Sequence, residues 1–373
     1  MAVRPASSSI SPVLRKLAPI TTGLGEIYHY TVHYKKDFKE APADPIERLR
    51  QLKLVQDYVV KPALRTVPGV TEVNTSGSYD KQIVVTPDPA KLASIGLTIS
   101  ELADVLALVE GNGATGATLV PLVDYVAFTG SVATGRKVAQ SAANDFKRLT
   151  LELGGNDAAL VLDDADVDAV AARIFGAAFV NSGQICMAIK RLYVQEGVYD
   201  PLVERLATFA RNARVGNGLA PQTQLGPVQN EAQFRIVQEF IASARADGAD
   251  FAAGGHVLDR PGYFVAPTIA LGLGEGSRLV DGEPFGPVLP VMRFRTVEEG
   301  IARANATPYG LGASVWSDDA QRIERVIAGL QAGTLWVNDH AAPDPMVPFG
   351  GIKQSGLGRE SGLLGLKHFM EPV

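Results

Sequence analysis

The sequence predicts an α/β fold for the C-terminal two-thirds of this 373-residue chain and an α+β fold for the part before it. After about residue 120, short apolar segments of strand character alternate with segments of helical period, which is typical of layered α/β proteins. Before it, strands and helices follow the order of a split βαβ sandwich of the ferredoxin-like type. Residues 111–120, rich in glycine and threonine, separate the two parts, and their composition favours a flexible link.

Composition and charge restrict the class of protein. A hydrophobic fraction of 46% with 20% charged residues fits an ordinary soluble globular protein, and a net charge of −5 gives no reason to expect a nucleic-acid partner. The single cysteine excludes an intramolecular disulfide and a multi-cysteine metal site. Because no apolar run reaches about 18 residues and the N-terminus lacks an apolar signal core, we expect no membrane span and a cytoplasmic location.

The first part contains the elements of a small α+β domain. They are a strand over 25–34, an amphipathic helix over 45–64, strands over 69–74 and 81–86, a short helix near 89–95, and a helix from Thr98, capped through Glu101, to about residue 110. His29 and His33 lie four residues apart on the first of these strands. That spacing places both on one face without directing them at a common metal, so we expect no metal site here.

Segments of this first part resemble heavy-metal efflux pumps of the resistance–nodulation–division type. The similar segments are 17–28 (LAPITTGLGEIY), 64–74 (LRTVPGVTEVN) and 88–92 (DPAKL). The resemblance covers about residues 10–118 and implies a fragment of the periplasmic porter region. Since nothing in this fragment spans a bilayer, transport by the fragment alone has no physical support.

The second part contains strands and helices in alternation. Its predicted strands are 123–129, 149–152, 289–294, 312–316 and 333–337, and its predicted helices are 132–142, 167–180, 200–213 and 231–247. Asp163, Asp164 and Asp166 precede the second of these helices. Because carboxylates suit a helix N-terminus electrostatically, we expect this acidic cluster to stabilise the helix rather than to bind a metal.

Gly130 and Ser131 lie between a predicted strand and a predicted helix, where backbone N–H groups commonly bind phosphate. Gly130 and Gly135 have the outer spacing of a P-loop, but Arg136 follows where a lysine is required, which rejects a nucleoside-triphosphate site. The dinucleotide pattern Gly-x-Gly-x-x-Gly is also missing. From the residues alone, a structural turn is an equally good interpretation.

Two further residues indicate covalent catalysis. Cys186, the only cysteine, follows a Gly183-Gln184 bend, and Glu152 ends a predicted strand just before the glycine pair at 154–155. A sulfur presented by a loop and a carboxylate at a strand end are what a covalent intermediate with a hydrolytic second step requires. Taken one at a time, a lone cysteine is more often a small buried side chain and a lone glutamate a solvated one.

The segments Leu151–Asn156 and Gly183–Cys186 together resemble the two signature segments of the aldehyde dehydrogenase superfamily, in that family's order and approximate spacing. The resemblance covers about residues 121–373. It implies an aldehyde-dehydrogenase-like catalytic domain beside a truncated Rossmann-type cofactor domain. The implied division is a porter-like fragment over 1–118, a remnant of the dinucleotide-binding domain over 119–154, a catalytic domain over 155–365 and the start of an oligomerisation strand over 366–373.

The resemblance implies oxidation of a small aldehyde to a carboxylic acid, with NAD or NADP as hydride acceptor and a homo-oligomer as one assembly state. Cys186 would form a thioester and Glu152 would activate the water that hydrolyses it. Relatives that pass the acyl group to coenzyme A usually lack this glutamate, so a free acid is expected. The other implied roles are Gly130, Ser131, Gly135 and Leu153 beside the cofactor, Glu283 on the nicotinamide ribose, Phe285 against the nicotinamide ring, Phe349 in the aldehyde tunnel, and structural roles for Lys353 and Arg359.

The sequence departs from the family pattern upstream of residue 121. The family's second oxyanion donor is an asparagine in a Pro-Trp-Asn segment, and its first nucleotide-binding strands carry a lysine that grips the adenosine ribose. Neither is found here, because pump-like sequence occupies that region. Loss of one oxyanion donor costs about 10²–10³ in rate. We therefore expect impaired activity, and the alternative is a catalytically inactive chimeric remnant that carries a porter fragment.

Overall fold

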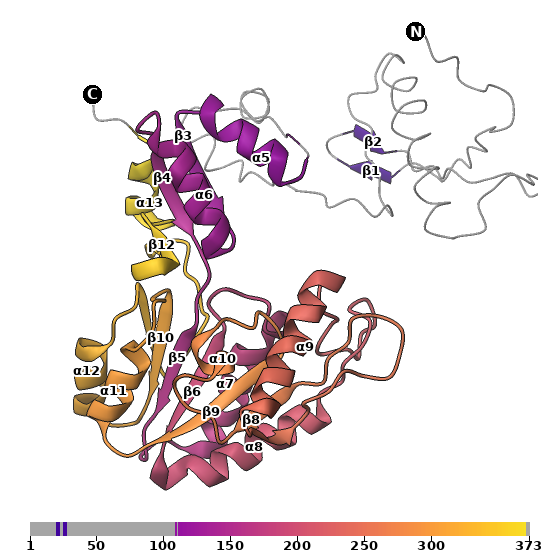
Figure 1. Cartoon of the computed structure of the whole chain (residues 1–373), viewed down its shortest axis with the longest axis vertical. Helices are drawn as coiled ribbons and strands as arrows, with labels where there is room; N and C mark the ends of the chain where they lie inside the picture. Colours follow the sequence, from indigo (N-terminus) through magenta and orange to yellow (C-terminus); the bar gives the residue numbers. More distant parts are fainter. Residues whose placement is uncertain (1–19, 23–24, 28–108, 110, 371–373) are drawn as a thin grey trace, which may run out of the picture. The chain divides into compact units, whose positions relative to one another are not determined.

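The computed structural model describes residues 20–22, 25–27, 109 and 111–370 (Figure 1). The contacts within the chain divide it into two compact units, Met1–Leu108 and Val109–Val373. In the first unit, β1 (Ile20–Thr22) and β2 (Gly25–Ile27) form an antiparallel pair. The strand expected from residue 25 is confirmed over β2. The other elements expected in this unit, and both of its histidines, lie outside the described residues.

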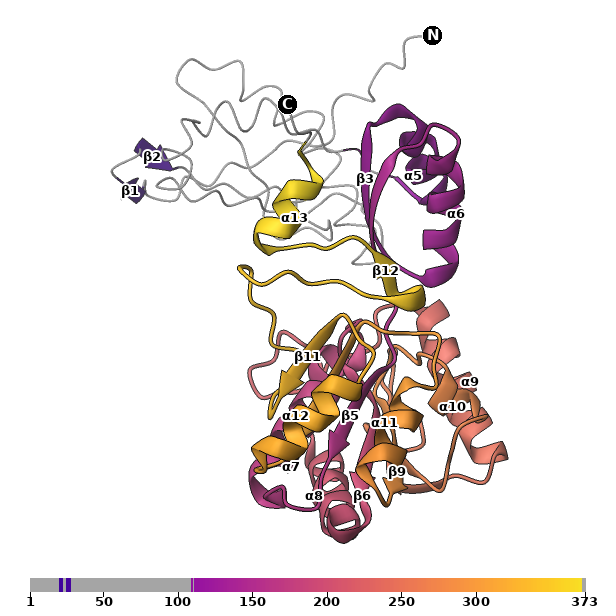
Figure 2. The ribbon, with the colours of Figure 1, turned by 90° about the vertical axis from the view of Figure 1, so that its left-hand side faces the viewer.

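The larger sheet of the second unit has seven strands in the order β11-β10-β5-β6-β9-β8-β7 (Figures 1 and 2). Its strands are β5 (Asp157–Val161), β6 (Ile189–Gln195), β7 (Asp250–Ala253), β8 (Thr268–Leu271), β9 (Val288–Phe294), β10 (Gly312–Trp316) and β11 (Thr334–Val337). All neighbours run parallel except the antiparallel pair of β7 and β8. Strands β5 and β10 are buried along their whole length, as expected for a parallel sheet covered on both faces.

Helices cover both faces of this sheet, and the alternation of side chains along β5 shows which helices cover which face. Ala159 and Val161 belong to a core that includes residues of α7 (Val167–Phe179) and α8 (Tyr199–Asn212). Ala158 and Leu160 face the opposite way, into a core with residues of α11 (Val297–Asn305) and α12 (Ala320–Gly329). A third core joins α9 (Glu231–Ala246) and α10 (Arg278–Asp281) to β8 and β9.

A second sheet of three strands has the order β12-β4-β3. Its strands are β3 (Tyr125–Thr129), β4 (Arg148–Glu152) and β12 (Gly356–Leu357). The helix α6 (Val132–Ala143) connects β3 to the parallel β4, so these elements form a βαβ unit. Glu152, the last residue of β4, is paired with Thr129 on one side and Gly356 on the other. The assignment of this region to a truncated Rossmann-type domain stays a prediction.

Nine elements predicted for the second unit from their sequence patterns are confirmed, with ends that agree within two residues. The predicted helices are α6, α7, α8 and α9, and the predicted strands are β3, β4, β9, β10 and β11. The sequence patterns do not predict the strands from β5 to β8. Strands β5 and β6 are buried on both faces, so they lack the polar–apolar alternation that identifies a half-buried strand.

Two expectations are wrong in the described residues. The stretch over 111–120, expected as a flexible link, contains the helix α5 (Gly113–Leu119) and begins the short 3-10 helix η2 (Val120–Leu122). The side chain of Asn112 caps α5 by accepting a hydrogen bond from the Ala114 N–H at 2.9 Å, and this cap outweighs the low helix propensity of the glycines.

The second wrong expectation is a strand from residue 366. Residues up to His368 belong to the helix α13 (Gly362–His368) instead. A helix satisfies its backbone groups internally, as in the hydrogen bond from Gly365 N–H to the Ser361 carbonyl, whereas a strand needs a neighbouring strand. Residues 371–373 lie outside the described part of the chain.

Candidate active site

The loop before Cys186 has an unusual backbone. Three consecutive residues, Asn181, Ser182 and Gly183, have φ angles of 50°, 57° and 73°, all in the left-handed region. A Cβ at Gly183 would collide with the carbonyl of Gly286, so this position requires glycine for both conformation and space. Ser182 is buried, and its hydroxyl donates to the Gly226 carbonyl at 2.8 Å. The turn between α7 and Cys186 is therefore fixed by contacts with segments that lie far along the chain.

The buried side chain of Gln184 connects this loop to the segment between α8 and α9. Its amide nitrogen donates to the carbonyls of Asn181 at 3.0 Å and Pro227 at 3.3 Å. Its amide oxygen accepts from the Gln229 N–H at 2.9 Å. Both polar atoms of the Gln184 side chain are hydrogen-bonded to backbone groups, so this residue fixes the backbone that leads to Cys186.

Cys186 is half-buried, and Lys190 is its main charged neighbour. The Lys190 Nζ donates to the carbonyls of Ile185 at 2.7 Å and Cys186 at 2.6 Å, and it lies 3.2 Å from a carboxylate oxygen of Glu283. Burial raises the pKa of the Cys186 thiol above its ordinary value, while Lys190 and the Met187 N–H act in the opposite direction. At neutral pH the group is therefore a thiol that must lose its proton before it acts as a nucleophile.

Glu152 is a buried carboxylate without a hydrogen-bond partner. Its exposed fraction is 3%, and neither carboxylate oxygen has a partner within the described part of the chain. Burial raises its pKa to about 8, with a further increase from Glu360 and a decrease from Arg359. A Cβ at Gly350 would lie 2.8 Å from Glu152 Oε1, so the bare backbone of that glycine leaves space for the carboxylate.

The glycine pair after Glu152 brings the two signature segments together. A Cβ at Gly155 would lie 2.6 Å from the Cys186 carbonyl oxygen, so the bend lies directly against the backbone of the cysteine. The Gly155 N–H donates to Glu283 Oε1 at 3.2 Å, and a Cβ at Gly154 would collide with the other oxygen of the same carboxylate. The structure thus places Cys186, Glu283 and the bend that follows Glu152 in one region.

The predicted cofactor residues of the smaller sheet also lie together. Ser131 caps α6 by accepting from the Thr134 N–H at 3.2 Å, and the Gly130 N–H donates to the Glu152 carbonyl at 3.0 Å. Gly135 lies so close to the side chain of Leu153 that a Cβ would collide with it. The first N–H groups of α6 have no partner inside the helix, which is the arrangement that suits a phosphate.

Glu283 and Phe285 lie in a segment that is fixed by contacts with α9 and with Lys190. The Gln233 amide donates to the carbonyls of Pro284 at 3.0 Å and Phe285 at 3.2 Å, and Phe285 has a left-handed φ of 44°. Lys190 Nζ lies 5.9 Å from the centroid of the Phe285 ring. Burial raises the pKa of Glu283, although Lys190 opposes the change. The carboxylate oxygens of Glu283 can accept hydrogen bonds from hydroxyl groups, so this residue fits the ribose of a dinucleotide.

Phe349 lies on the same side of the site as Glu152. It exchanges backbone hydrogen bonds of 2.8 and 2.7 Å with Glu360, and it precedes the glycine that lies against Glu152. Lys353 and Arg359, expected to be structural, both donate to backbone carbonyls. Their contacts hold the chain between β11 and α13.

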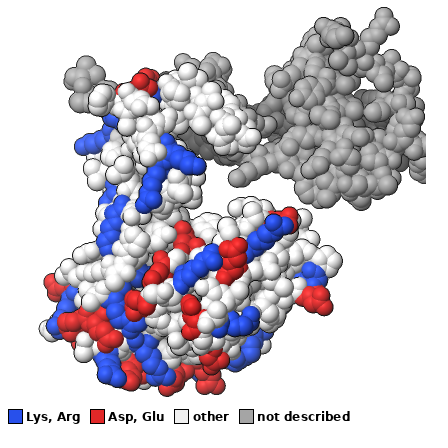
Figure 3. All heavy atoms as spheres, viewed as in Figure 1, with Lys and Arg blue, Asp and Glu red and all other residues white. Residues whose placement is uncertain are grey.

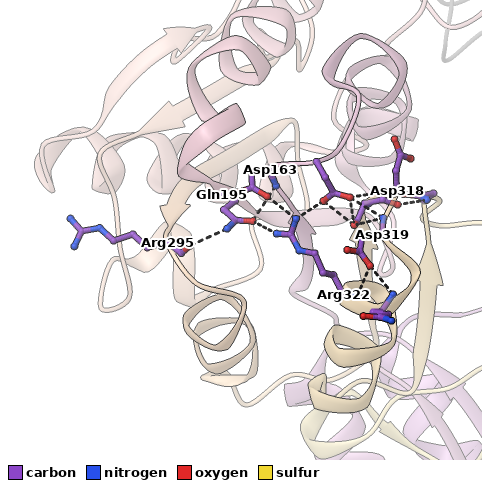
Figure 4. A network of polar contacts seen from close by, with 10 residues as sticks. Asp163, Gln195, Arg295, Asp318, Asp319 and Arg322 are labelled. Atoms are coloured by element: carbon purple, nitrogen blue, oxygen red, sulfur yellow. Dashed lines mark hydrogen bonds and ion pairs between the residues drawn. The ribbon is translucent and has the colours of Figure 1, made fainter.

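The acidic residues before α7 have protein partners. Asp166 caps that helix by accepting from the N–H groups of Asp168 and Ala169. Figure 4 shows the Arg322 side chain between Asp163, Gln195 and the segment of Asp318 and Asp319. Arg322 pairs with Asp163 at 2.7 Å and with Asp164 at 2.9 Å. These contacts join the ends of β5, β6 and β10 to α12.

Sequence reasoning missed Lys190 and His340. The first is a lysine inside the buried strand β6, with a residue exposure of 2%, and a charged residue in an apolar run is a detectable signal. The second lies far along the chain, after β11, yet His340 Nε2 lies 3.0 Å from the carbonyl of Met187. Nothing in its sequence neighbourhood indicates that contact.

Comparison with known proteins places this site in a family. The family model described as "Aldehyde dehydrogenase family" matches residues 90–373, which is most of the chain. The chain belongs to the aldehyde dehydrogenase family. The match begins earlier than the expected position near residue 121, within the segment that resembles an efflux pump. The porter-like assignment of the residues before it stays a prediction.

Several aldehyde dehydrogenases are similar to this chain. A betaine aldehyde dehydrogenase of Cereibacter sphaeroides is 42% identical over 291 residues, which is 77% of this chain and 60% of the relative. Among solved structures, a mutant of aldehyde dehydrogenase from Bacillus cereus matches with a TM-score of 0.69 at 38% identity, over 70% of this chain and 54% of that one. Betaine aldehyde dehydrogenase from Staphylococcus aureus, solved in complex with NAD⁺, matches with a TM-score of 0.68 at 35% identity, over 69% and 53%.

The chain spans little more than half the length of the relatives it matches. The family assignment therefore covers the second unit and the fold of its two sheets. In the described residues, no helix is long and apolar enough to cross a membrane. The expected cytoplasmic location stays a prediction.

Proposed function

We propose that this chain oxidises an aldehyde to a carboxylic acid through a thioester on Cys186. The thiolate adds to the aldehyde carbon, a hydride leaves that carbon with two electrons, and a thioester remains on the sulfur. Bound NAD or NADP would accept this hydride. Water then adds to the thioester while Glu152 takes its proton, the carbon–sulfur bond breaks, and the acid leaves with the thiolate restored.

The observation that carries this proposal is the state of Glu152. Its carboxylate is buried, neither oxygen has a hydrogen-bond partner in the described part of the chain, and its pKa is raised to about 8. A buried acceptor that nothing satisfies favours a water molecule or substrate as its partner. A base whose pKa lies close to neutral pH is well matched to take a proton from water at that pH.

We propose that the cofactor residues act at two points. The N-terminus of α6, with Gly130, Ser131 and Gly135 packed on Leu153, would hold the pyrophosphate. Glu283 would accept hydrogen bonds from the nicotinamide ribose, and Phe285 would lie against the nicotinamide ring. We propose either NAD or NADP as the hydride acceptor.

The substrate class follows from relatives and from one aromatic residue. Betaine aldehyde dehydrogenases stand among the similar proteins, and the half-buried Phe349 lies beside the Glu152 region. An aromatic face attracts a quaternary ammonium group. We therefore propose that aldehydes with a cationic group, tested through betaine aldehyde, are accepted together with simple aldehydes.

We further propose that turnover is slow for the chain as it stands. The Cys186 N–H is the one oxyanion donor that we assign, since the Pro-Trp-Asn segment of the family does not occur in the sequence. Loss of a second donor lowers the rate by about 10²–10³. Assembly into a homo-oligomer is a separate proposal, and the exposed leucines and methionines of α13 and the segment before it support it.

The experiment measures two activities of the complete chain. Reduction of NAD or NADP by aldehydes is followed at 340 nm, and hydrolysis of an activated ester is followed without cofactor. We expect both activities, and we expect Cys186→Ala to abolish both. Ester hydrolysis without reduction of either cofactor would contradict the proposed oxidation. It would show only that the Cys186 thiol is reactive. Absence of both activities would support an inactive chimeric chain.

A further inference from the structure

The Cys186 loop contacts one group that the proposed chemistry does not use, the imidazole of His340. This side chain has an exposed fraction of 0% and follows β11 in the chain. Its Nε2 lies 3.0 Å from the carbonyl oxygen of Met187, and its Nδ1 lies 2.8 Å from Ser314 Oγ. Because Met187 directly follows Cys186, the ring contacts the turn that presents the sulfur.

The chemistry of each partner determines the direction of these hydrogen bonds. A carbonyl oxygen only accepts, so His340 Nε2 carries the proton that is donated to Met187. The indole nitrogen of Trp316 only donates, and it lies 3.0 Å from Ser314 Oγ. The Ser314 hydroxyl accepts from the indole and also makes the hydrogen bond to His340 Nδ1. One chain of hydrogen bonds thus leads from Trp316 through Ser314 and His340 to the backbone of the cysteine loop.

The surroundings of the ring leave it little freedom. Trp336 packs against it with 4.8 Å between ring centroids, and the His340 N–H donates to Asp339 Oδ1 at 2.9 Å. The carboxylate of Asp157 lies 3.7 Å from Nε2, and both of these side chains are buried. Both ring nitrogens therefore have hydrogen-bond partners where the ring lies.

We propose that His340 is a positioning residue that fixes Cys186 through the carbonyl of Met187. The inference rests on the proposed function, because it takes Cys186 as the nucleophile. Lys190 holds the carbonyls of residues 185 and 186, and His340 holds the next carbonyl along the chain. With these three carbonyls held, the Met187 N–H keeps its interaction with the sulfur, which favours the thiolate.

Two variants separate the hydrogen bond from the packing of the ring. His340→Phe keeps a ring against Trp336 but removes both hydrogen bonds of the imidazole. His340→Gln removes the ring but retains a side-chain N–H that can donate to the Met187 carbonyl. A purely structural role of the ring predicts that Phe is the milder substitution, whereas the positioning role predicts that Gln is.

The measurement is alkylation by iodoacetamide as a function of pH. Because Cys186 is the only cysteine, the pH profile reports its thiol pKa and its reactivity without any aldehyde or cofactor. We expect His340→Phe to raise the thiol pKa and to slow alkylation of the thiolate about tenfold. We expect His340→Gln to stay within about threefold of the parent chain.

The unfolding temperature of each variant is measured beside its alkylation. A folded His340→Phe chain with parental alkylation overturns the proposal, as does a His340→Gln chain as slow as His340→Phe. If His340→Phe fails to fold, Ser314→Ala removes the hydroxyl that contacts Nδ1 and accepts from the Trp316 indole. A raised thiol pKa in this variant supports the proposal, and an unchanged one overturns it. A parent chain without aldehyde oxidation that still shows these alkylation differences contradicts the proposed function alone and supports the positioning role.

Discussion

The two sheets of the second unit differ in how completely their surfaces are covered. In the seven-stranded sheet, β5 and β10 are buried throughout and helices lie on both faces. In the three-stranded sheet, β3 is half exposed, and large apolar side chains around it remain in contact with solvent. These exposed side chains include Leu122, Phe146, Met346, Leu357, Leu363, Leu364, Leu366, Phe369 and Met370.

Charge is distributed differently in the two regions. Figure 3 shows acidic and basic side chains interspersed over the seven-stranded region, mainly basic ones over the part that contains the three-stranded sheet, and a largely uncharged surface over α5. The Arg322 network joins strand ends and a helix in the first region. The nucleophile therefore belongs to a region with large buried cores, whereas Glu152 belongs to a sheet beside which much apolar surface is exposed. We expect the position of the thiol to be less sensitive to substitution than the environment of the carboxylate.

The largest expected effect tests the role of Glu152 in the smaller sheet. Glu152→Gln removes the base but resembles the protonated acid in shape, so the fold should be retained. We expect hydrolysis of the thioester to slow about 10²–10⁴-fold, with acyl-enzyme accumulating after one rapid turnover. Rapid-mixing kinetics with mass detection of the acyl group measure this. Full turnover at the parental rate would remove Glu152 from the mechanism.

The pH dependence of the same step gives the second effect. Because burial raises the pKa of Glu152 to about 8, the carboxylate is mostly protonated at pH 6 and becomes a base as the pH rises through 8. We expect the hydrolysis rate to increase about tenfold per pH unit below that pKa and to level off above it. The Glu152→Gln chain should lack this rise. A profile that falls between pH 6 and 8 would contradict the assigned environment of the carboxylate.

A matched pair of leucines tests the difference in burial directly. Leu202 in α8 has an exposed fraction of 0%, and Leu363 in α13 has one of 65%. We expect Leu202→Ala to lower the free energy of unfolding by about 2–5 kcal/mol. The same substitution at Leu363 should change it by less than about 0.5 kcal/mol. Denaturant unfolding of both chains is the measurement. Similar losses at the two positions would show that α13 is covered in solution.

The smallest expected effect compares two helix caps, one beside each sheet. Ser131 caps α6 and Asp166 caps α7, so replacement of either by alanine should cost about 1 kcal/mol. We expect Ser131→Ala to reduce hydrogen-exchange protection mainly in α6 and β3, since this region has fewer buried contacts. Asp166→Ala should lower protection across the larger sheet. An equal loss over both sheets would mean that they unfold as one unit.

Local patterns in the sequence predicted four helices of the second unit, α6 to α9, and five of its strands, because their apolar period or their neighbouring turns are visible over a few residues. The pair Cys186 and Glu152 was singled out through the resemblance of their two segments to the aldehyde dehydrogenase signatures, because either residue alone is more often a buried or a solvated side chain. A helix in the expected link at 111–120 was not foreseen, because its cap depends on one asparagine among glycines.

The sequence by itself determined the types of nine helices and strands of the second unit and, through a resemblance, the residues that are proposed to carry the chemistry. Only the tertiary structure decided the partners of those residues: Gly155 against the Cys186 carbonyl, the two carbonyls on Lys190, and the carboxylate of Glu152 without a partner in the described residues. His340 follows the edge strand β11, and it contacts Met187, which precedes the inner strand β6 and lies 153 residues earlier in the chain. Such contacts depend on which strands lie side by side, and a pKa depends on the burial that results, so neither is encoded in any short stretch of sequence.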